Sequence, residues 1–183
     1  MKKKRNIIIL IVVLVLLCGW GIRSFYDNYR FGHELYITVN RMSTPSYLLA
    51  RAIDHLENEF EKMENEYQGD DRHAFDTAMF KIRYQFDYDG MPLLEDVCAE
   101  WRDQFEELYQ QTKSNEGLAY IFTDEKKFNE IANLRDQLYD LVEVFEDFRE
   151  SYNQMSEWER YFVSWKDEQK ILSEKVRFSP LPQ

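Results

Sequence analysis

An uninterrupted apolar segment near the N-terminus is the feature that most constrains this chain. The sixteen residues from Ile7 to Ile22 (IIILIVVLVLLCGWGI) carry no charge, and four positive residues, Lys2 to Arg5, precede them. As a helix this segment covers about 24 Å, slightly less than the apolar core of a bilayer. Arg23 can extend its charged end outward and Trp20 can lie in the interface, so a slightly short helix still fits. We therefore predict a transmembrane signal-anchor over residues 6–24.

The distribution of positive charge predicts the orientation of this segment. Four positive residues precede it and a single arginine follows it closely, a bias that places the N-terminus in the cytoplasm. Residues 1–5 are then a cytoplasmic tail, and the domain that follows lies outside, in the periplasm or the extracellular space. The sequence thus predicts a single-pass membrane protein that contacts membrane lipid through residues 6–24.

Two other interpretations of the segment stay open. A cleaved secretory signal peptide shares the basic start and the apolar core, but Gly19 and Gly21 are a poor substitute for the A-x-A-like cleavage site. A lipoprotein signal ending at Cys18 is indicated by VLLCG, although Leu17 is bulky where that pattern has a small residue. We favour the uncleaved anchor.

The charge of the remaining chain excludes one class of partner. The formal net charge is −11, and without the four N-terminal positive residues 19 basic residues face 34 acidic ones, a net charge of −15. Such a surface repels nucleic-acid phosphates, so we expect no nucleic-acid partner. Hydrophobic residues make up 44% of the chain and aromatic residues 16%, which is typical of a sequence that folds around a core.

Few residues after the anchor would break a helix. Only six glycines and four prolines are present, so long helices can form between them. We predict a helical stalk over 25–42, with Gly32 as its weak point. Ser43 to Pro45 have the residue types of an N-cap and a first helical turn, and predict that a new helix starts there. Gly69 and Asp89–Gly90 are expected to end this helix and the next one.

Two further helices are expected in the C-terminal half. Pro92 opens the third helix, and Asn115 to Gly117 break it. Thr123 is expected to cap the fourth and longest helix. Ser156 to Glu159 match a capping box, so the sequence leaves open whether this helix continues or restarts there.

The apolar residues of these four segments recur at alternating steps of four and three, the spacing of one helix face. Four amphipathic helices with short connections bury their stripes most simply by packing together. We predict an all-α fold, an antiparallel four-helix bundle over 43–176 with a C-terminal tail over 177–183. Two helical hairpins that complete their core by dimerising are the alternative. The expected core positions are Leu49, Ile53, Leu56, Phe60, Met63 and Tyr67; Phe75, Met79, Ile82 and Phe86; Leu94, Cys98, Trp101, Phe105, Leu108 and Thr112; and Ile131, Leu134, Leu138, Leu141, Phe145, Phe148, Tyr152 and Met155.

The chain carries no recognisable catalytic motif. It has no P-loop, no GxGxxG, no nucleophile elbow and no zinc-ligand spacing. Cys98 lies on an apolar stripe and is expected to be a buried structural thiol that cannot pair with Cys18. We predict a protein without a catalytic site or a cofactor.

No residue group makes a strong metal site. From Gln85 to Asp96 the chain resembles a calcium-binding loop in length, but Gln85 replaces the first aspartate and Pro92 interrupts the pattern, so a plain turn is the better interpretation. His55 and Glu59 are four residues apart and are expected to be a solvated pair. We predict no bound metal.

The densest aromatic cluster consists of Trp158, Tyr161, Phe162 and Trp165. Such residues are most often core, but an exposed aromatic patch on an acidic body would be a partner-binding site. We therefore predict a membrane-anchored extracytoplasmic helical interaction or scaffold protein, a non-catalytic subunit or accessory of a membrane or envelope complex. Its partner would be another membrane or envelope protein, or a second copy of the chain. The alternatives are a ligand-sensing bundle that signals through a partner and, with less support, a metal-dependent enzyme.

Overall fold

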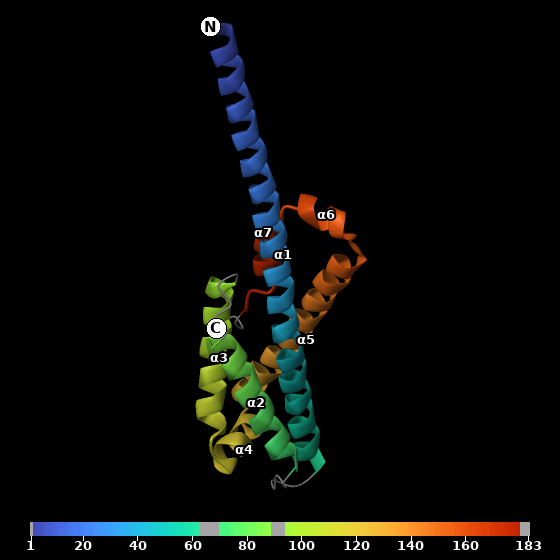
Figure 1. Ribbon diagram of the computed structural model, residues 1–183. Coiled ribbons are helices and arrows are strands. Elements are labelled where there is room, and N and C mark those ends of the chain that lie inside the picture. Colours follow the sequence, from blue (N-terminus) through green and yellow to red (C-terminus); the bar gives the residue numbers. More distant parts are fainter. Residues whose placement is uncertain (1, 63–69, 89–93, 180–183) are drawn as a thin grey trace.

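Seven helices and no strand make up the part of the chain that the computed structural model describes, residues 2–62, 70–88 and 94–179. The all-α class predicted from the sequence is confirmed. The predicted helix ends at Gly69 and Asp89–Gly90, and the predicted start at Pro92, lie outside the described residues. The helices are α1 (Lys2–Lys62), α2 (Asp70–Tyr88), α3 (Glu95–Thr112), α4 (Asn115–Thr123), α5 (Glu125–Gln154), α6 (Glu157–Phe162) and α7 (Trp165–Lys175) (Figure 1).

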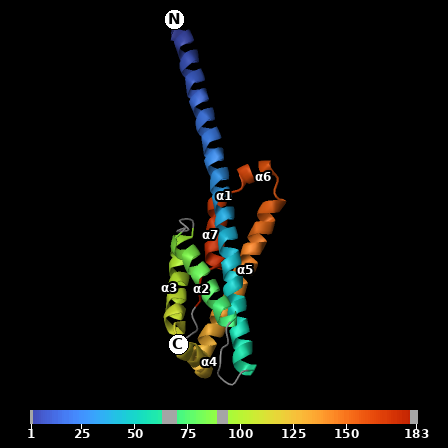
Figure 2. The ribbon, with the colours of Figure 1, turned by 60° about the horizontal axis from the view of Figure 1, so that its bottom comes forward.

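α1 is one unbroken helix that carries both the apolar segment and part of the core. Its N-terminal part projects alone, and its C-terminal part lies against α2 and α5 (Figures 1 and 2). The bulky apolar side chains from Ile11 to Ile22 are exposed, whereas Leu35, Val39 and Met42 are fully buried. Among the described helices, α1 is the one whose length and composition would allow it to cross a membrane.

The predicted helix start at Ser43 to Pro45 is wrong, because α1 continues through Pro45. Proline lacks the N–H that would bond to the carbonyl four residues earlier, and inside a helix it costs about 3 kcal/mol. Burial offsets this cost. A row of fully buried side chains at steps of four and three passes through the proline without a break, and Ser46, its polar member, donates its hydroxyl hydrogen to Met42 O at 2.8 Å. The row consists of Leu35, Val39, Met42, Ser46, Leu49, Ile53 and Leu56.

α2 packs on α1, and α3 packs on α2. Phe86 and Phe105 meet edge to face with their ring centroids 5.0 Å apart. The indole N–H of Trp101 donates to Val176 O at 2.7 Å, which ties the C-terminal end of α7 to α3. The predicted core positions of the two helices are confirmed, since all of them are buried: Phe75, Met79, Ile82, Phe86, Leu94, Cys98, Trp101, Phe105, Leu108 and Thr112.

A short helix, α4, occupies the segment for which the sequence predicts a break, Asn115 to Gly117. The side chain of Ser114 caps it by accepting the N–H of Gly117 at 3.0 Å. A Cβ at Gly117 would lie 2.1 Å from Gln111 O, so only glycine fits this tight entry. The predicted cap at Thr123 is also wrong: Asp124 caps α5 by accepting the N–H of Lys127 at 3.0 Å.

α5 lies along α1, and α6 and α7 bring the chain back to α1. The capping box predicted at Ser156 to Glu159 is confirmed and starts α6, so the long helix ends at Gln154 and does not continue. α6 lies at the end of the domain from which the N-terminal part of α1 projects (Figures 1 and 2). Most predicted core positions of α5 are buried, namely Ile131, Leu134, Leu138, Leu141, Phe145 and Tyr152, while Phe148 and Met155 are partly buried.

Candidate functional site

α6 is fastened to α1 immediately after the apolar segment. The side-chain amide of Asn28 donates to two carbonyls of the α6 region, Tyr161 O at 3.3 Å and Val163 O at 2.8 Å. Tyr29 and Tyr161 stack with their ring centroids 4.5 Å apart and their planes 13° apart. A helix of six residues is too short to be stable alone, so these contacts determine where α6 lies.

The start of α6 is fixed by its own capping box. The Ser156 hydroxyl accepts the N–H of Glu159 at 3.3 Å, and the Glu159 carboxylate accepts the N–H of Ser156 at 2.7 Å. These hydrogen bonds favour the ionised carboxylate and lower the pKa of Glu159. The start of α6 after α5 is therefore determined by residues of the turn itself, Ser156 and Glu159.

Trp165, the first residue of α7, is the buried anchor of this region. Its side chain is 1% exposed, and its indole N–H donates to Arg160 O at 2.8 Å. The ring lies near Tyr152, with centroids 5.3 Å apart, and packs against Gly32 of α1. Gly32, predicted to be a weak point of the helix, is instead the residue that lets the indole approach the α1 backbone.

The structure divides the four residues of the predicted partner-binding cluster. Trp165 is buried and Tyr161 is half-buried on Tyr29, so both hold α6 and α7 in place. Trp158 and Phe162 are 76% and 71% exposed. Trp158, Tyr161, Phe162 and Trp165 therefore do not form one face, because α6 and α7 are separate helices.

Trp158 and Phe162 extend an apolar path that begins on the N-terminal part of α1. The ring of Phe162 meets that of Phe25 edge to face, with centroids 5.6 Å apart. Phe25 is itself 49% exposed and follows the exposed Ile22 by three residues, which places both on one side of α1. We call Phe25, Trp158 and Phe162 the aromatic surface.

A hollow of about 600 Å³ lies between α1 and the start of α7. Trp20, Arg23 and Asn28 line it from α1, and Lys166 lines it from α7. The Nε of Arg23 is 3.7 Å from the Asp27 carboxylate, and this pair is exposed. The hollow thus places two cationic side chains and an indole at the C-terminal end of the apolar segment.

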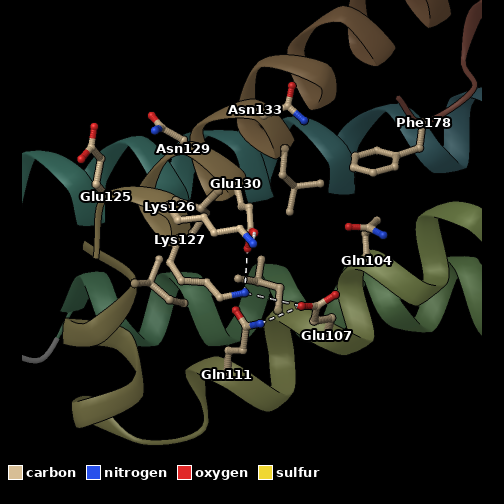
Figure 3. Close-up of a pocket in the computed structure, with 14 residues that line it drawn as sticks. Gln104, Glu107, Gln111, Glu125, Lys126, Lys127, Asn129, Glu130, Asn133 and Phe178 are labelled. Atoms are coloured by element: carbon tan, nitrogen blue, oxygen red, sulfur yellow. Dashed lines mark hydrogen bonds and ion pairs between the residues drawn. The ribbon is translucent and has the colours of Figure 1, made fainter. Parts of the chain in front are cut away.

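A second groove of about 600 Å³ lies between α3, α4 and α5 (Figure 3). Leucine and isoleucine side chains contribute to its lining, and Phe178 lies at one end of it. Lys127 extends toward two carboxylates, with its Nζ 2.7 Å from Glu130 and 3.8 Å from Glu107. The hydrogen bond to Glu130 raises the pKa of Lys127, so its amine stays a paired cation and is a poor nucleophile.

The other residues considered for chemistry lie apart from these two sites. His55 is exposed beside Arg51, with 3.4 Å between Arg51 Nε and His55 Nε2. Cys98 is buried, as predicted, and burial raises the pKa of its thiol to about 11. Cys18 and Cys98 are both free thiols. The segment from Gln85 to Asp96 lies partly outside the described residues.

Among the described residues, no group of three or more histidines, cysteines, aspartates or glutamates could hold a metal ion.

Asn28, Tyr29 and Gly32 position the aromatic surface, yet the sequence pattern predicts no role for Asn28 or Tyr29 and only a weak point at Gly32. The signal for two of them is present in the spacing: Asn28 and Gly32 continue the buried row of α1 toward the N-terminus at steps of four and three before Leu35. A polar residue and a glycine interrupt the apolar pattern at these positions. Each marks a contact with another helix instead of a break.

Comparisons with known proteins give no relative for this chain: no protein-family model matches it, and neither does any curated protein or solved structure.

Proposed function

We propose that this chain is a membrane-anchored, extracytoplasmic helical interaction or scaffold protein, a non-catalytic subunit or accessory of a membrane or envelope complex. In this proposal residues 6–24 span the membrane, and the C-terminal part of α1 forms an antiparallel bundle with α2, α3 and α5 outside the cytoplasm. The four positive residues from Lys2 to Arg5 support this orientation. The partner is another membrane or envelope protein, or a second copy of the chain.

The observation that carries the proposal is the unbroken α1. The same helix that holds the exposed apolar segment reaches the core at Leu35, with no described break between them. The hydrogen bonds from Asn28 fasten α6 to the same stretch. The domain therefore cannot swing on a flexible tether. A domain held rigidly by its span favours docking onto a partner in the same membrane, because it loses less rotational and conformational entropy on binding.

The position of the aromatic surface limits what can meet it. Phe25 follows Ile22 by three residues, and its ring contacts Phe162. Whatever binds Trp158 and Phe162 must therefore lie at the level where the proposed span ends.

The experiment that tests this proposal makes α1 flexible between span and domain. A short glycine-serine stretch inserted after Ser24 keeps Phe25, Asn28 and all core residues on the domain side. We expect the variant to remain in the membrane and to melt at the wild-type temperature, but to lose the proteins that co-purify with the wild-type chain from native membranes. The matched control carries the same stretch after Gln183 and should retain them. Unchanged co-purification with the flexible variant would contradict the proposal.

The proposed orientation is tested separately. External protease should digest the domain on intact cells or spheroplasts, with the envelope opened where one is present. Protection of the domain under conditions that degrade a known external protein would place it on the other side.

A ligand-sensing bundle is the second candidate function, and the groove between α3 and α5 favours it. A volume of about 600 Å³ falls in the range of small-molecule sites, and Lys127 with Glu107 supplies charges of both signs. A small-molecule fraction from the native cell should then slow hydrogen exchange in α3 and α5. Gln104→Trp, which fills the groove from a partly exposed position, should abolish that protection. Equal protection in this variant would remove the groove as the ligand site.

A further inference from the structure

We infer that α6 lies in the interfacial layer of the membrane that α1 spans, with the side chains of Trp158 and Phe162 in contact with lipid. This inference rests on the proposed anchoring through α1. It adds a second membrane contact, made by a segment more than 130 residues further along the chain from the span; the hydrogen bond from Asn28 to Val163 alone joins residues 135 positions apart.

The height of α6 above the span follows from α1 itself. Phe25 is three residues beyond Ile22, which on a helix corresponds to about 4.5 Å along the axis. Its ring touches that of Phe162, with centroids 5.6 Å apart. The polar interfacial layer on each side of a bilayer is about 5–8 Å thick. Phe162 therefore lies at the depth of the interfacial layer when the apolar segment fills the membrane core.

The chemistry of the exposed side chains matches this layer. Trp158 and Phe162 are four residues apart on α6, so they share a face, and more than two thirds of each side chain is exposed. Two large aromatic groups exposed together on an acidic domain are unfavourable in water. Indole rings are enriched at membrane–water interfaces, where the apolar ring is buried and the N–H stays hydrated.

The surface is held in position without lipid. Asn28 donates to Tyr161 O and Val163 O, and Trp165 is locked between Gly32 and its hydrogen bond to Arg160 O. Both views place α6 beside the stretch of α1 that leaves the domain (Figures 1 and 2). Contact with lipid therefore requires no rearrangement of the domain.

The local charges indicate which lipid surface fits. Glu157 and Glu159 on α6 oppose Arg160 on the same helix and Lys166 on the next one. On α1, Arg23 is paired with Asp27, so this end of the domain has no excess of positive charge. Attraction to anionic headgroups is then weak, and burial of the aromatic rings provides the driving force. We expect contact with a zwitterionic bilayer.

The test uses the full chain reconstituted in phosphatidylcholine vesicles, with and without bromine atoms on the acyl chains next to the headgroup. Bromine quenches the fluorescence of tryptophans that it contacts. Subtracting the emission of the Trp158→Phe variant from that of the wild-type chain gives the emission of Trp158. The same subtraction with the Trp20→Phe variant gives the emission of Trp20. Both side chains are exposed, so both variants should fold, and circular dichroism verifies that they do.

We expect brominated lipid to reduce the Trp158 emission by a fraction comparable to the loss for Trp20, while iodide in the water quenches it weakly. Quenching of Trp20 by lipid, with Trp158 open to iodide and unaffected by bromine, would overturn the lipid contact while leaving the anchor in place. The aromatic surface would then be free for a protein partner. If neither tryptophan is quenched by brominated lipid, the proposed anchoring is itself wrong, and the inference fails with it.

Discussion

Trp165 lies so close to Gly32 that a Cβ built on the glycine would be 2.3 Å from carbon Cε2 of the indole. This contact joins α7 to α1 just beyond the proposed span, and it requires a residue without a side chain. The indole cannot retreat easily, because its N–H is bonded to Arg160 O at 2.8 Å.

Gly32→Ala should therefore destabilise the domain. Alanine favours a helix over glycine by about 1 kcal/mol, but overpacking of a filled site costs about 1–3 kcal/mol, and a rigid ring at 2.3 Å makes the clash the larger effect. Urea unfolding followed by circular dichroism measures the difference. Gly21→Ala is the matched control, since nothing lies within 4 Å of its Cβ. Equal stability of the two variants would show that the indole moves aside freely.

Trp165→Ala should lower the stability of the domain strongly, whereas Trp158→Ala should leave it almost unchanged. Trp165 is 1% exposed, and truncation of a buried tryptophan costs about 3–5 kcal/mol. Trp158 is 76% exposed, and its replacement should change the free energy of unfolding by no more than about 0.5 kcal/mol. Thermal melts of the two variants under one condition provide the measurement. A large loss with Trp158→Ala would mean that its ring is covered in the folded protein.

A fragment that begins at Ser43 should be much less stable than one that begins at Phe25. The shorter fragment lacks Leu35 and Val39, whose burial contributes about 1.5–3 kcal/mol each, and it removes Gly32 from beneath Trp165. We expect the longer fragment to melt in one transition. The shorter one should melt at a lower temperature, with red-shifted tryptophan emission. Matching melts would mean that the segment 25–42 does not contribute to the core in solution.

The stability of the domain should fall between pH 9 and pH 11 because of Cys98. Burial raises the pKa of its thiol from 9.0 to about 11, so over this range the unfolded chain releases a proton that the folded chain retains. The stabilisation is complete below pH 9, and up to about 2–3 kcal/mol is lost by pH 11. Cys98→Ala should lose less stability over the same range in urea unfolding. All other titratable groups are common to both proteins, so the difference reports on Cys98 alone, and identical pH slopes would show that the thiol has no such role.

The helical class and the buried stripes of α2 and α3 could be predicted because they depend on local spacing. An apolar residue at every third or fourth position selects a helix and its buried face together. Positions such as Met79 and Trp101 are buried as predicted. The capping box at Ser156 could be predicted for a similar reason, since its two hydrogen bonds are formed within four residues.

The continuity of α1 could not be predicted from Pro45 alone. A proline and a serine near each other are typical of a helix start, but the buried row that runs through Ser46 contributes more stability than the proline costs. Whether a local breaker ends a helix depends on the packing that the helix makes on both sides of it. In this chain that packing comes from α2 and α5, which are distant in sequence.

The division of the aromatic cluster and the groove between α3 and α5 depend on tertiary structure. Trp165 points into the core because the chain turns at Val163 and Ser164, and that turn is held by Asn28 from α1. The groove exists because of the distance at which α5 passes α3, which no spacing in either helix encodes. The sequence therefore identified the aromatic residues on the α6 and α7 side of the candidate site, whereas their partners on α1, Phe25 and Tyr29, emerge only from the structure.

In the proposed topology, the unbroken α1 also makes the position of the domain depend on the thickness of the bilayer. Its apolar segment covers about 24 Å, against a bilayer core of about 30 Å. A short span on a flexible tether can tilt or shift without consequence for the domain behind it, but any tilt of α1 carries Leu35 and the whole domain with it. Tilting would also shorten the span further, so the mismatch is met by the outward extension of flanking side chains such as Arg23 and by thinning of the lipid around the helix. In the proposed topology the chain therefore fits thin membranes with the least distortion, and membrane thickness sorts it among compartments.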